Sequence, residues 1–206
     1  KIIQVEKEKR LPTIETIEKP THCPVCASPL RQDEEEVVIR CENLHCPAMK
    51  QSLLEHFVSR EAMNIDNLGP SLIAQLLASG KVKNIPDLYR LTKEDLLELE
   101  RMADKSADNV ITAIAKSKEN SLEHFLHSLG IRFIGRTSAR NIARHFKNLD
   151  DIIQASIEDL KTVPDVGERM AQSLYQFFHQ ERELAEVLEL KALGLPTEFK
   201  GSVKNL

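Results

Sequence analysis

The sequence predicts a mainly α-helical protein, in which a small four-cysteine zinc module is followed by a helical domain of four repeated helix–turn–helix units. Three observations lead to this fold class. All four cysteines lie within 24 residues of the 206-residue chain. After Pro47, apolar residues recur at three- and four-residue spacing, which is typical of amphipathic helices. The helical region also repeats itself at a period near 32 residues.

The cysteines form two pairs, Cys23-x2-Cys26 and Cys41-x4-Cys46. This is the ligand spacing of a closed, tetrahedral structural zinc site, and the chain between the pairs is long enough for a short hairpin. Two disulfides, unligated core cysteines and an iron–sulfur cluster are the alternatives, but the spacing and the cysteine-free remainder disfavour them. The predicted metal ligands are Cys23, Cys26, Cys41 and Cys46.

Several features of this module follow from its size. It is too small to bury a self-sufficient core, so metal binding is expected to supply its folding energy, about 10–16 kcal/mol in comparable peptides. Residues 37–39, Val-Val-Ile, read as a strand that leads into the second cysteine pair. The nearby histidines are expected to be structural or solvated, because four thiolates already complete the shell; they are His22, His45 and His56.

Composition limits the function classes. The net charge is −4, tryptophan is absent and aromatic residues make up 4%, which disfavours base-stacking platforms for single strands. The sequence has no apolar run long enough to span a membrane and no signal peptide, so a cytoplasmic protein without membrane contact is expected. No constellation of an activated nucleophile or an open metal site is present, and we predict no catalytic residue.

Changes in pattern along the chain suggest its domain boundaries. Residues 1–19 combine a short β segment, Lys1–Val5, with a charge run, Glu6–Arg10, and read as a linker or as the end of a preceding domain. Residues 20–50 form the zinc module, 51–200 the helical domain and 201–206 a tail.

The repeat is visible in two interleaved alignments. Residues 92–107 align without a gap on residues 156–171, and both segments open with a hydroxyl residue followed three positions later by aspartate, a variant of the capping box. Residues 65–74 align on residues 131–140. The turn positions of the four units are then Gly69, Ala103, Gly135 and Gly167.

Each turn precedes a helix whose first N–H groups and dipole can accept a phosphate. Glycine at the turn is expected to supply positive φ and to let another backbone come close. This is the sequence form of the helix–hairpin–helix motif, which contacts the nucleic-acid backbone without reading bases. Tight interhelix turns in a plain helical bundle are the alternative for any single unit. The second unit is the weakest, because Arg101 and Ala103 stand where glycine is expected.

Basic residues support the third unit most strongly. Three arginines recur every four residues and form one stripe, Arg132 and Lys147 extend it, and no acidic residue occurs at helical spacing there. Lys105 and Arg169 are secondary candidates, and Lys81 and Lys83 are weaker ones. The predicted DNA-binding residues are Gly69, Gly135, Gly167, Arg132, Arg136, Arg140, Arg144, Lys105 and Arg169.

Longer strings resemble a known family. The module from Pro20-Thr-His-Cys-Pro-Val-Cys26 to Cys41-Glu-Asn-Leu-His-Cys46 resembles the zinc finger of bacterial NAD-dependent DNA ligases. The segments 56–69 and 129–135 resemble that family's helix–hairpin–helix domain, and the resemblance covers about residues 1–200.

This resemblance implies a function. Family members seal nicks in duplex DNA for replication and repair by adenylating a lysine with NAD, transferring AMP to the 5′-phosphate, and joining the 3′-hydroxyl. The adenylated lysine lies in a Lys-x-Asp-Gly string, which this sequence does not contain. The resemblance thus implies a non-catalytic carboxy-terminal fragment with one structural zinc ion, in which residues 1–19 are the tail of the family's oligonucleotide-binding domain. Its partners would be nicked duplex DNA and the other ligase domains. NAD and magnesium would be needed only by the domains that are missing here.

The sequence departs from the family at the first glycine position of each hairpin, which holds Asn67, Arg101, Phe133 and Asp165. Phosphate contacts are therefore expected from the remaining turn glycines rather than from these residues. Two other functions stay open: a helix–hairpin–helix module of a repair nuclease or junction-processing protein, and a scaffold that binds proteins but not DNA.

Overall fold

The computed structural model describes residues 6–9, 17–32, 37–43 and 46–201, and the chain divides into two compact units, Lys1–Pro47 and Ala48–Leu206. The described residues contain eleven α-helices and one two-stranded sheet, so the predicted mainly α-helical fold is confirmed. None of the helices in these ranges has the length and apolar character needed to cross a membrane. The predicted β segment Lys1–Val5, residue His45 and nearly all of the 201–206 tail lie outside the described residues.

The first unit contains a short 3-10 helix, η1 (Lys7–Lys9), and an antiparallel hairpin of β1 (Leu30–Arg31) and β2 (Arg40–Cys41). Leu30 pairs with Cys41 in this hairpin. The expected strand at residues 37–39 is wrong, because β2 begins only at Arg40, directly after these residues. Val37 and Val38 are 89% and 53% exposed, so their apolar side chains have no layer to pack against, and the pairing forms beside the cysteines instead.

The second unit is built from helices joined by short turns. The helices are α1 (Pro47–Val58), α2 (Pro70–Ala78), α3 (Ile85–Leu88), α4 (Lys93–Leu97), α5 (Asp104–Ser117), α6 (Leu122–Ser128), α7 (Arg136–Phe146), α8 (Leu149–Gln154), α9 (Ile157–Lys161), α10 (Glu168–His179) and α11 (Glu181–Ala192).

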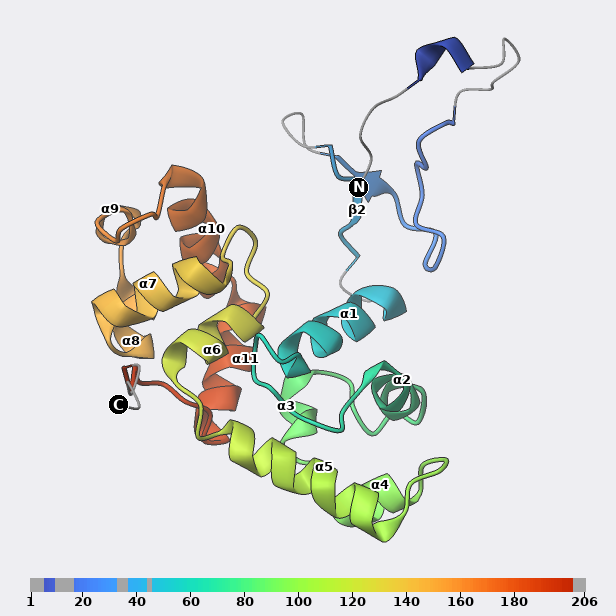
Figure 1. Cartoon of the computed structure of the whole chain (residues 1–206). Coiled ribbons are helices and arrows are strands. Elements are labelled where there is room, and N and C mark those ends of the chain that lie inside the picture. The colour runs from blue at the N-terminus through green and yellow to red at the C-terminus, as the bar shows by residue number, and fades with distance from the viewer. Residues whose placement is uncertain (1–5, 10–16, 33–36, 44–45, 202–206) are drawn as a thin grey trace. The chain divides into compact units, whose positions relative to one another are not determined.

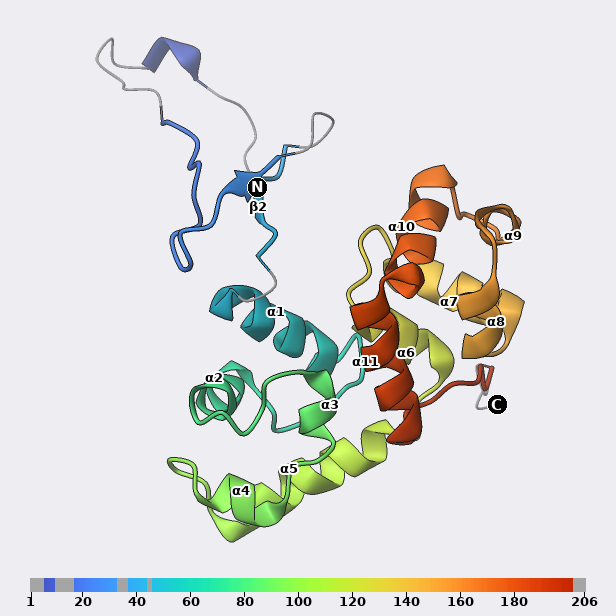
Figure 2. The ribbon, with the colours of Figure 1, turned by 180° about the vertical axis from the view of Figure 1, so that it is seen from behind.

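These helices form four hairpins, of which the first two make up the first half of the array and the last two the second half. Helices α1 and α2, α4 and α5, α6 and α7, and α9 and α10 flank the four turns. In both views of the ribbon, α7–α10 lie at one end of this unit and α2, α4 and α5 at the other (Figure 1; Figure 2). Helices α1, α3, α6 and α11 lie between these ends.

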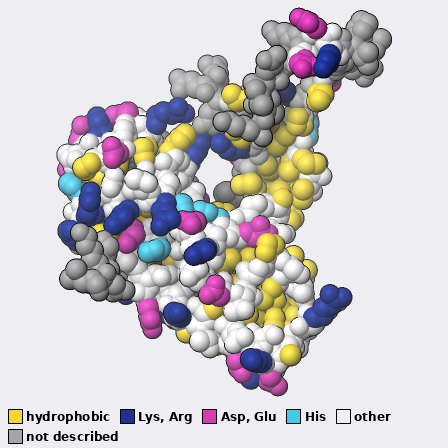
Figure 3. Space-filling model, in the orientation of Figure 1, with side chains coloured by type: hydrophobic (Ala, Val, Ile, Leu, Met, Phe, Trp, Pro, Cys, Tyr) yellow, Lys and Arg dark blue, Asp and Glu magenta, His cyan; other side chains and the backbone are white. Residues whose placement is uncertain are grey.

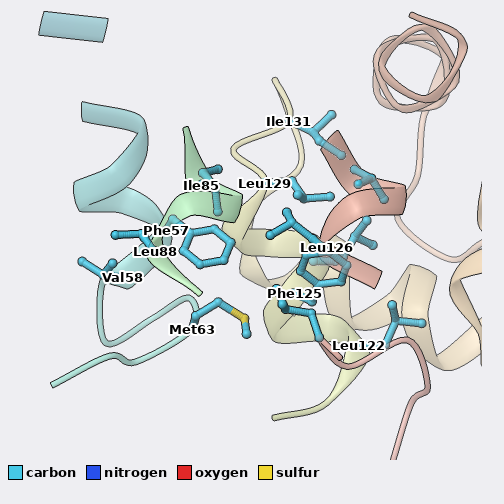
Figure 4. Packing of buried hydrophobic residues seen from close by; sticks show 14 of the residues in the cluster. Phe57, Val58, Met63, Ile85, Leu88, Leu122, Phe125, Leu126, Leu129 and Ile131 are labelled. Carbon is cyan, nitrogen blue, oxygen red and sulfur yellow. The ribbon is translucent and has the colours of Figure 1, made fainter. Parts of the chain in front are cut away.

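The core is one continuous cluster of buried apolar side chains in this unit. Phe57 and Phe125 are fully buried, and they come from the first and third hairpins (Figure 4). A polar contact also joins these hairpins, since His56 Nε2 lies 2.8 Å from the carbonyl oxygen of His127. The shared core therefore fixes the first half of the array against the second.

Helix starts agree with the predicted repeat. Thr92 and Ser156 each form a capping box, with Asp95 and Asp159 respectively, so the predicted boxes are confirmed. Their hydroxyl oxygens accept from the backbone N–H three residues later, and the aspartates accept from the backbone N–H of the capping residue. The same local geometry recurs because the same residues recur, which sets α4 and α9 in equivalent positions before their turns.

Candidate metal centre and nucleic-acid interface

The four cysteine sulfurs come together as the sequence predicts. Their Sγ atoms all lie within 4.8 Å of one another, with Cys23 and Cys46 3.9 Å apart and Cys26 and Cys41 3.6 Å apart. Four sulfurs bound tetrahedrally to zinc at 2.3 Å would lie about 3.8 Å apart. The donor set and its spacing therefore fit a zinc ion with no open coordination position.

Two local structures bring the pairs together. In the first pair, the N–H of Ala27 donates to the carbonyl oxygen of Cys23 at 2.9 Å, and Ala27 adopts a left-handed φ of 56°. The N–H of Cys23 donates to the carbonyl oxygen of Ser28 at 2.8 Å, which closes the loop. The β1–β2 hairpin then returns the chain so that Cys41 faces the first pair.

The electrostatics of the thiols also favour a bound cation. Hydrogen bonds from the side chain and backbone of Ser28 lower the pKa of Cys26 to about 6. A backbone hydrogen bond from Asn43 lowers the pKa of Cys41, but burial and the adjacent sulfurs of Cys26 and Cys23 outweigh it and raise that pKa to about 12. Such crowded sulfurs do not all become thiolates by themselves, whereas a divalent cation among them removes the repulsion.

The four turns share one backbone conformation. In each, the residue at the turn position is the N-cap of the next helix and is extended rather than left-handed. The φ and ψ angles are −84° and 175° at Gly69, −100° and 163° at Ala103, −85° and −179° at Gly135, and −87° and 175° at Gly167. The expectation that the turn glycines supply positive φ is therefore wrong.

Positive φ occurs two residues earlier, at the position where glycine was missing. The φ values are 66° at Asn67, 59° at Arg101, 66° at Phe133 and 63° at Asp165. The apolar residue between the two special positions points inward in three hairpins, where Leu68, Ile134 and Val166 are buried. One left-handed residue followed by one buried residue thus turns the chain and starts the next helix.

The turn glycines face open space. A Cβ atom added at Gly69, Gly135 or Gly167 would have no heavy atom within 4 Å. Ala103 has a side chain in the same backbone conformation, so neither strain nor internal crowding requires glycine at the other three turns. Glycine there leaves room for something outside the chain to approach the helix N-terminus.

The second hairpin keeps this geometry but differs in charge. Lys93 lies 2.9 Å from Asp104 and 2.9 Å from Asp108, so carboxylates occupy the first turns of α5. Lys105, a predicted contact residue, is exposed on the same first turn. Lys81 is one of the two weaker candidates, and its ammonium group lies 3.2 Å from Asp95 and 2.7 Å from Glu98.

The predicted basic stripe lies on α7. Arg136 is the first residue of this helix, and Arg140 and Arg144 follow at one-turn intervals. Lys and Arg side chains gather over this helix in the space-filling view (Figure 3). Lys147, at its C-terminal end, lies 5.2 Å from the Phe199 ring centroid, so it also packs against the chain's last described segment.

Two contacts in this region connect residues far apart in the sequence. Glu61, in the turn after α1, forms an ion pair with Arg136. The predicted residue Arg169 lies over the ring of Phe133, 4.7 Å from its centroid, where it joins Arg132, the neighbour of Phe133 in the sequence, at 4.9 Å. No helical spacing relates these partners, so sequence periodicity gave no signal for either contact.

Comparison with known proteins identifies the same two regions of the chain. Residues 22–48 match the model of the NAD-dependent DNA ligase C4 zinc finger domain. Residues 47–116 match a SAM-like helix-hairpin-helix tandem and residues 124–187 a helix-hairpin-helix motif. The DNA ligase of Bacillus subtilis (strain 168) is 46% identical over 203 residues, which is 98% of this chain and 30% of that protein. The DNA ligase of Bacillus mycoides (strain KBAB4) is 47% identical over 200 residues, 97% of this chain and 30% of that protein.

Over nearly its whole length, the chain therefore resembles the zinc-finger and helix–hairpin–helix part of NAD-dependent DNA ligases. It spans about 30% of the length of the ligases that it matches. Because residues 22–48 match the ligase C4 zinc finger, the metal that the four cysteines are positioned to bind is zinc.

Removal of zinc is expected to unfold the first unit and leave the second intact, because the apolar core formed by the described residues lies in the second. Replacing Cys46 with serine should reduce bound zinc from about one ion per chain to well below one, while the helical circular dichroism at 222 nm is largely kept. Metal analysis and circular dichroism measure the two effects.

The matched control is His22→Ala. Nδ1 of His22 lies 3.0 Å from the Thr21 hydroxyl and this histidine is not one of the grouped ligands, so the variant should keep its zinc. Full zinc content in Cys46→Ser, or loss of zinc in His22→Ala, would contradict this ligand assignment.

Proposed function

We propose that this chain is the duplex-DNA-binding part of an NAD-dependent DNA ligase, and that it holds DNA through the phosphate backbone without reading sequence. The observation that carries this proposal is the fourfold recurrence of one hairpin geometry, in which each turn delivers an extended N-cap and a helix N-terminus to the surface. Free N–H groups at such termini are suited to phosphate oxygens. The similarity to bacterial DNA ligases supports DNA as the partner.

Charge supports the third and fourth hairpins as the main contact region. Arg136, Arg140 and Arg144 follow one turn, and Arg169 follows the next. Arginine binds phosphate through its planar fork, so these residues would add charge-assisted bonds to those of the backbone amides. The second hairpin would contribute less, because Asp104 and Asp108 stand at the start of α5.

The zinc module would act structurally in this function. Four cysteines complete a tetrahedral shell, so the ion would have no position for a substrate or a catalytic water. We propose that the whole ligase seals nicks and that its adenylation chemistry occurs elsewhere, since the Lys-x-Asp-Gly string is absent from these 206 residues.

Fluorescence anisotropy with nicked, intact and branched duplexes of one sequence tests this function. We expect similar binding to the nicked and intact duplexes, because the backbone contacts are common to both. A strong preference for the branched duplex would favour a junction-processing protein instead. No binding to any of the three at low salt would favour a scaffold that binds only proteins.

Substitution of a turn glycine separates DNA contact from folding. Gly135→Ala should leave the unfolding free energy nearly unchanged, since the added Cβ meets nothing and Ala103 already adopts this conformation. The added methyl group would stand where a phosphate is proposed to approach the helix N-terminus. Duplex binding should therefore weaken by about tenfold, because a hydrogen bond to a charged group contributes roughly 1.5–3 kcal/mol. Thermal unfolding and anisotropy measure the two quantities, and unchanged affinity would contradict a phosphate contact at this turn.

The ion pair between Glu61 and Arg136 is expected to compete with DNA. Glu61→Gln should therefore tighten duplex binding by about two- to fivefold, the scale of one exposed ion pair. Glu94→Gln on α4 is the control, because it removes the same charge from an exposed position outside this pair. Equal tightening in both variants would mean that only the net charge changed and that the pair itself does not compete.

A further inference from the structure

The turn requires a left-handed residue at position 133, but the fold does not explain why that residue is phenylalanine. It is 40% exposed and has a φ of 66°. A bulky aromatic residue rarely adopts this left-handed region, whereas asparagine and aspartate tolerate it, and they occupy the equivalent position in the first and fourth hairpins. The ring is therefore retained at a position where burial gains little and the backbone disfavours it.

The ring connects two hairpins through arginine. The guanidinium carbon of Arg132 lies 4.9 Å from the ring centroid, and that of Arg169 lies 4.7 Å from it. Both distances fall within the range of a cation–π contact. Arg132 precedes Phe133 in the third turn, while Arg169 is the second residue of α10 and belongs to the fourth hairpin.

Two further contacts fix the same pair of hairpins. The hydroxyl of Ser173 on α10 donates to the carbonyl oxygen of Arg132 at 2.7 Å. The amide nitrogen of Asn141 on α7 lies 3.3 Å from the carbonyl oxygen of Pro164 and 3.3 Å from a carboxylate oxygen of Asp165, both in the fourth turn. The two arginines are thus held near one ring by a local frame that joins the third and fourth hairpins.

Two guanidinium groups held at one ring can bind one anion between them, and phosphate suits the guanidinium fork. The ring lies one residue before Ile134 and two residues before Gly135, the N-cap of α7, so such a phosphate would lie near the helix N-terminus.

We propose that Phe133 is a positioning residue, which holds Arg132 and Arg169 side by side so that the third and fourth hairpins bind one stretch of DNA backbone together. This inference rests on the proposed DNA-binding function. It assigns to Phe133 no contact with DNA of its own, and it makes the ring act only through the two arginines.

The test replaces the ring without straining the turn. Phe133→Asn puts at this position the residue that the first hairpin carries in the same conformation, so the melting temperature should stay the same or rise. Duplex affinity at low salt should fall on the order of fivefold, the scale that two exposed cation–π contacts support. The slope of log affinity against log salt should become less steep by about 0.9, which corresponds to the loss of one phosphate contact. Phe133→Tyr keeps the ring and should bind like the unsubstituted chain.

A background without both arginines, Arg132→Gln with Arg169→Gln, completes the experiment. If Phe133 acts through them, adding Phe133→Asn to this background should change the affinity less than twofold. An equal loss in both backgrounds would overturn the inference, since the ring would then contact DNA directly. Unchanged affinity in Phe133→Asn alone would also overturn it. If the unsubstituted chain binds no duplex, the proposed DNA-binding function fails first, and this inference fails with it.

Discussion

The helical unit depends on one backbone constraint, the pairing of a left-handed residue with an extended N-cap two positions later. This pairing occurs at Asn67 and Gly69 and again in the three other hairpins. In three of the hairpins it buries the intervening apolar residue, and in all four the N-cap of the following helix is exposed. A longer or differently shaped turn would bury the same side chains but would not present the N-termini in equivalent ways. The turn therefore links the packing of the unit to its proposed contact with phosphate.

The two units are stabilised by different interactions. The helical unit buries a continuous set of leucine, isoleucine, valine and phenylalanine side chains, and the shared core includes both halves of the repeat. The first unit has Val37 and Val38 exposed, and its four cysteines converge on one metal position. Metal binding replaces apolar burial there, which explains why a hairpin with only two short strands can form a defined structure.

Much of this architecture could be predicted from the sequence, because the signals were local and repeated. The cysteine spacing, the capping boxes at Thr92 and Ser156 and the four turns are examples of such signals. The conformation of the turns could not be predicted correctly, because glycine suggested positive φ at Gly135 whereas the strained residue is Phe133. The Glu61–Arg136 ion pair joins residues 75 positions apart, and only the folded chain brings them together. The three turn glycines were predicted to supply backbone freedom and room for close approach, and the structure shows open space but no positive φ at them.

The central claim is that the helical unit holds duplex DNA through phosphates, and the salt dependence of binding tests it most directly. The measurement is the affinity of this chain for two intact duplexes of unrelated sequence across a range of salt concentrations. The account predicts one steep slope shared by both duplexes, of about −0.9 for each phosphate neutralised, with equal affinities at every salt concentration. A shallow slope, or a duplex that is preferred at matched salt, would contradict it, because binding would then depend on base contacts or on no phosphate contact at all.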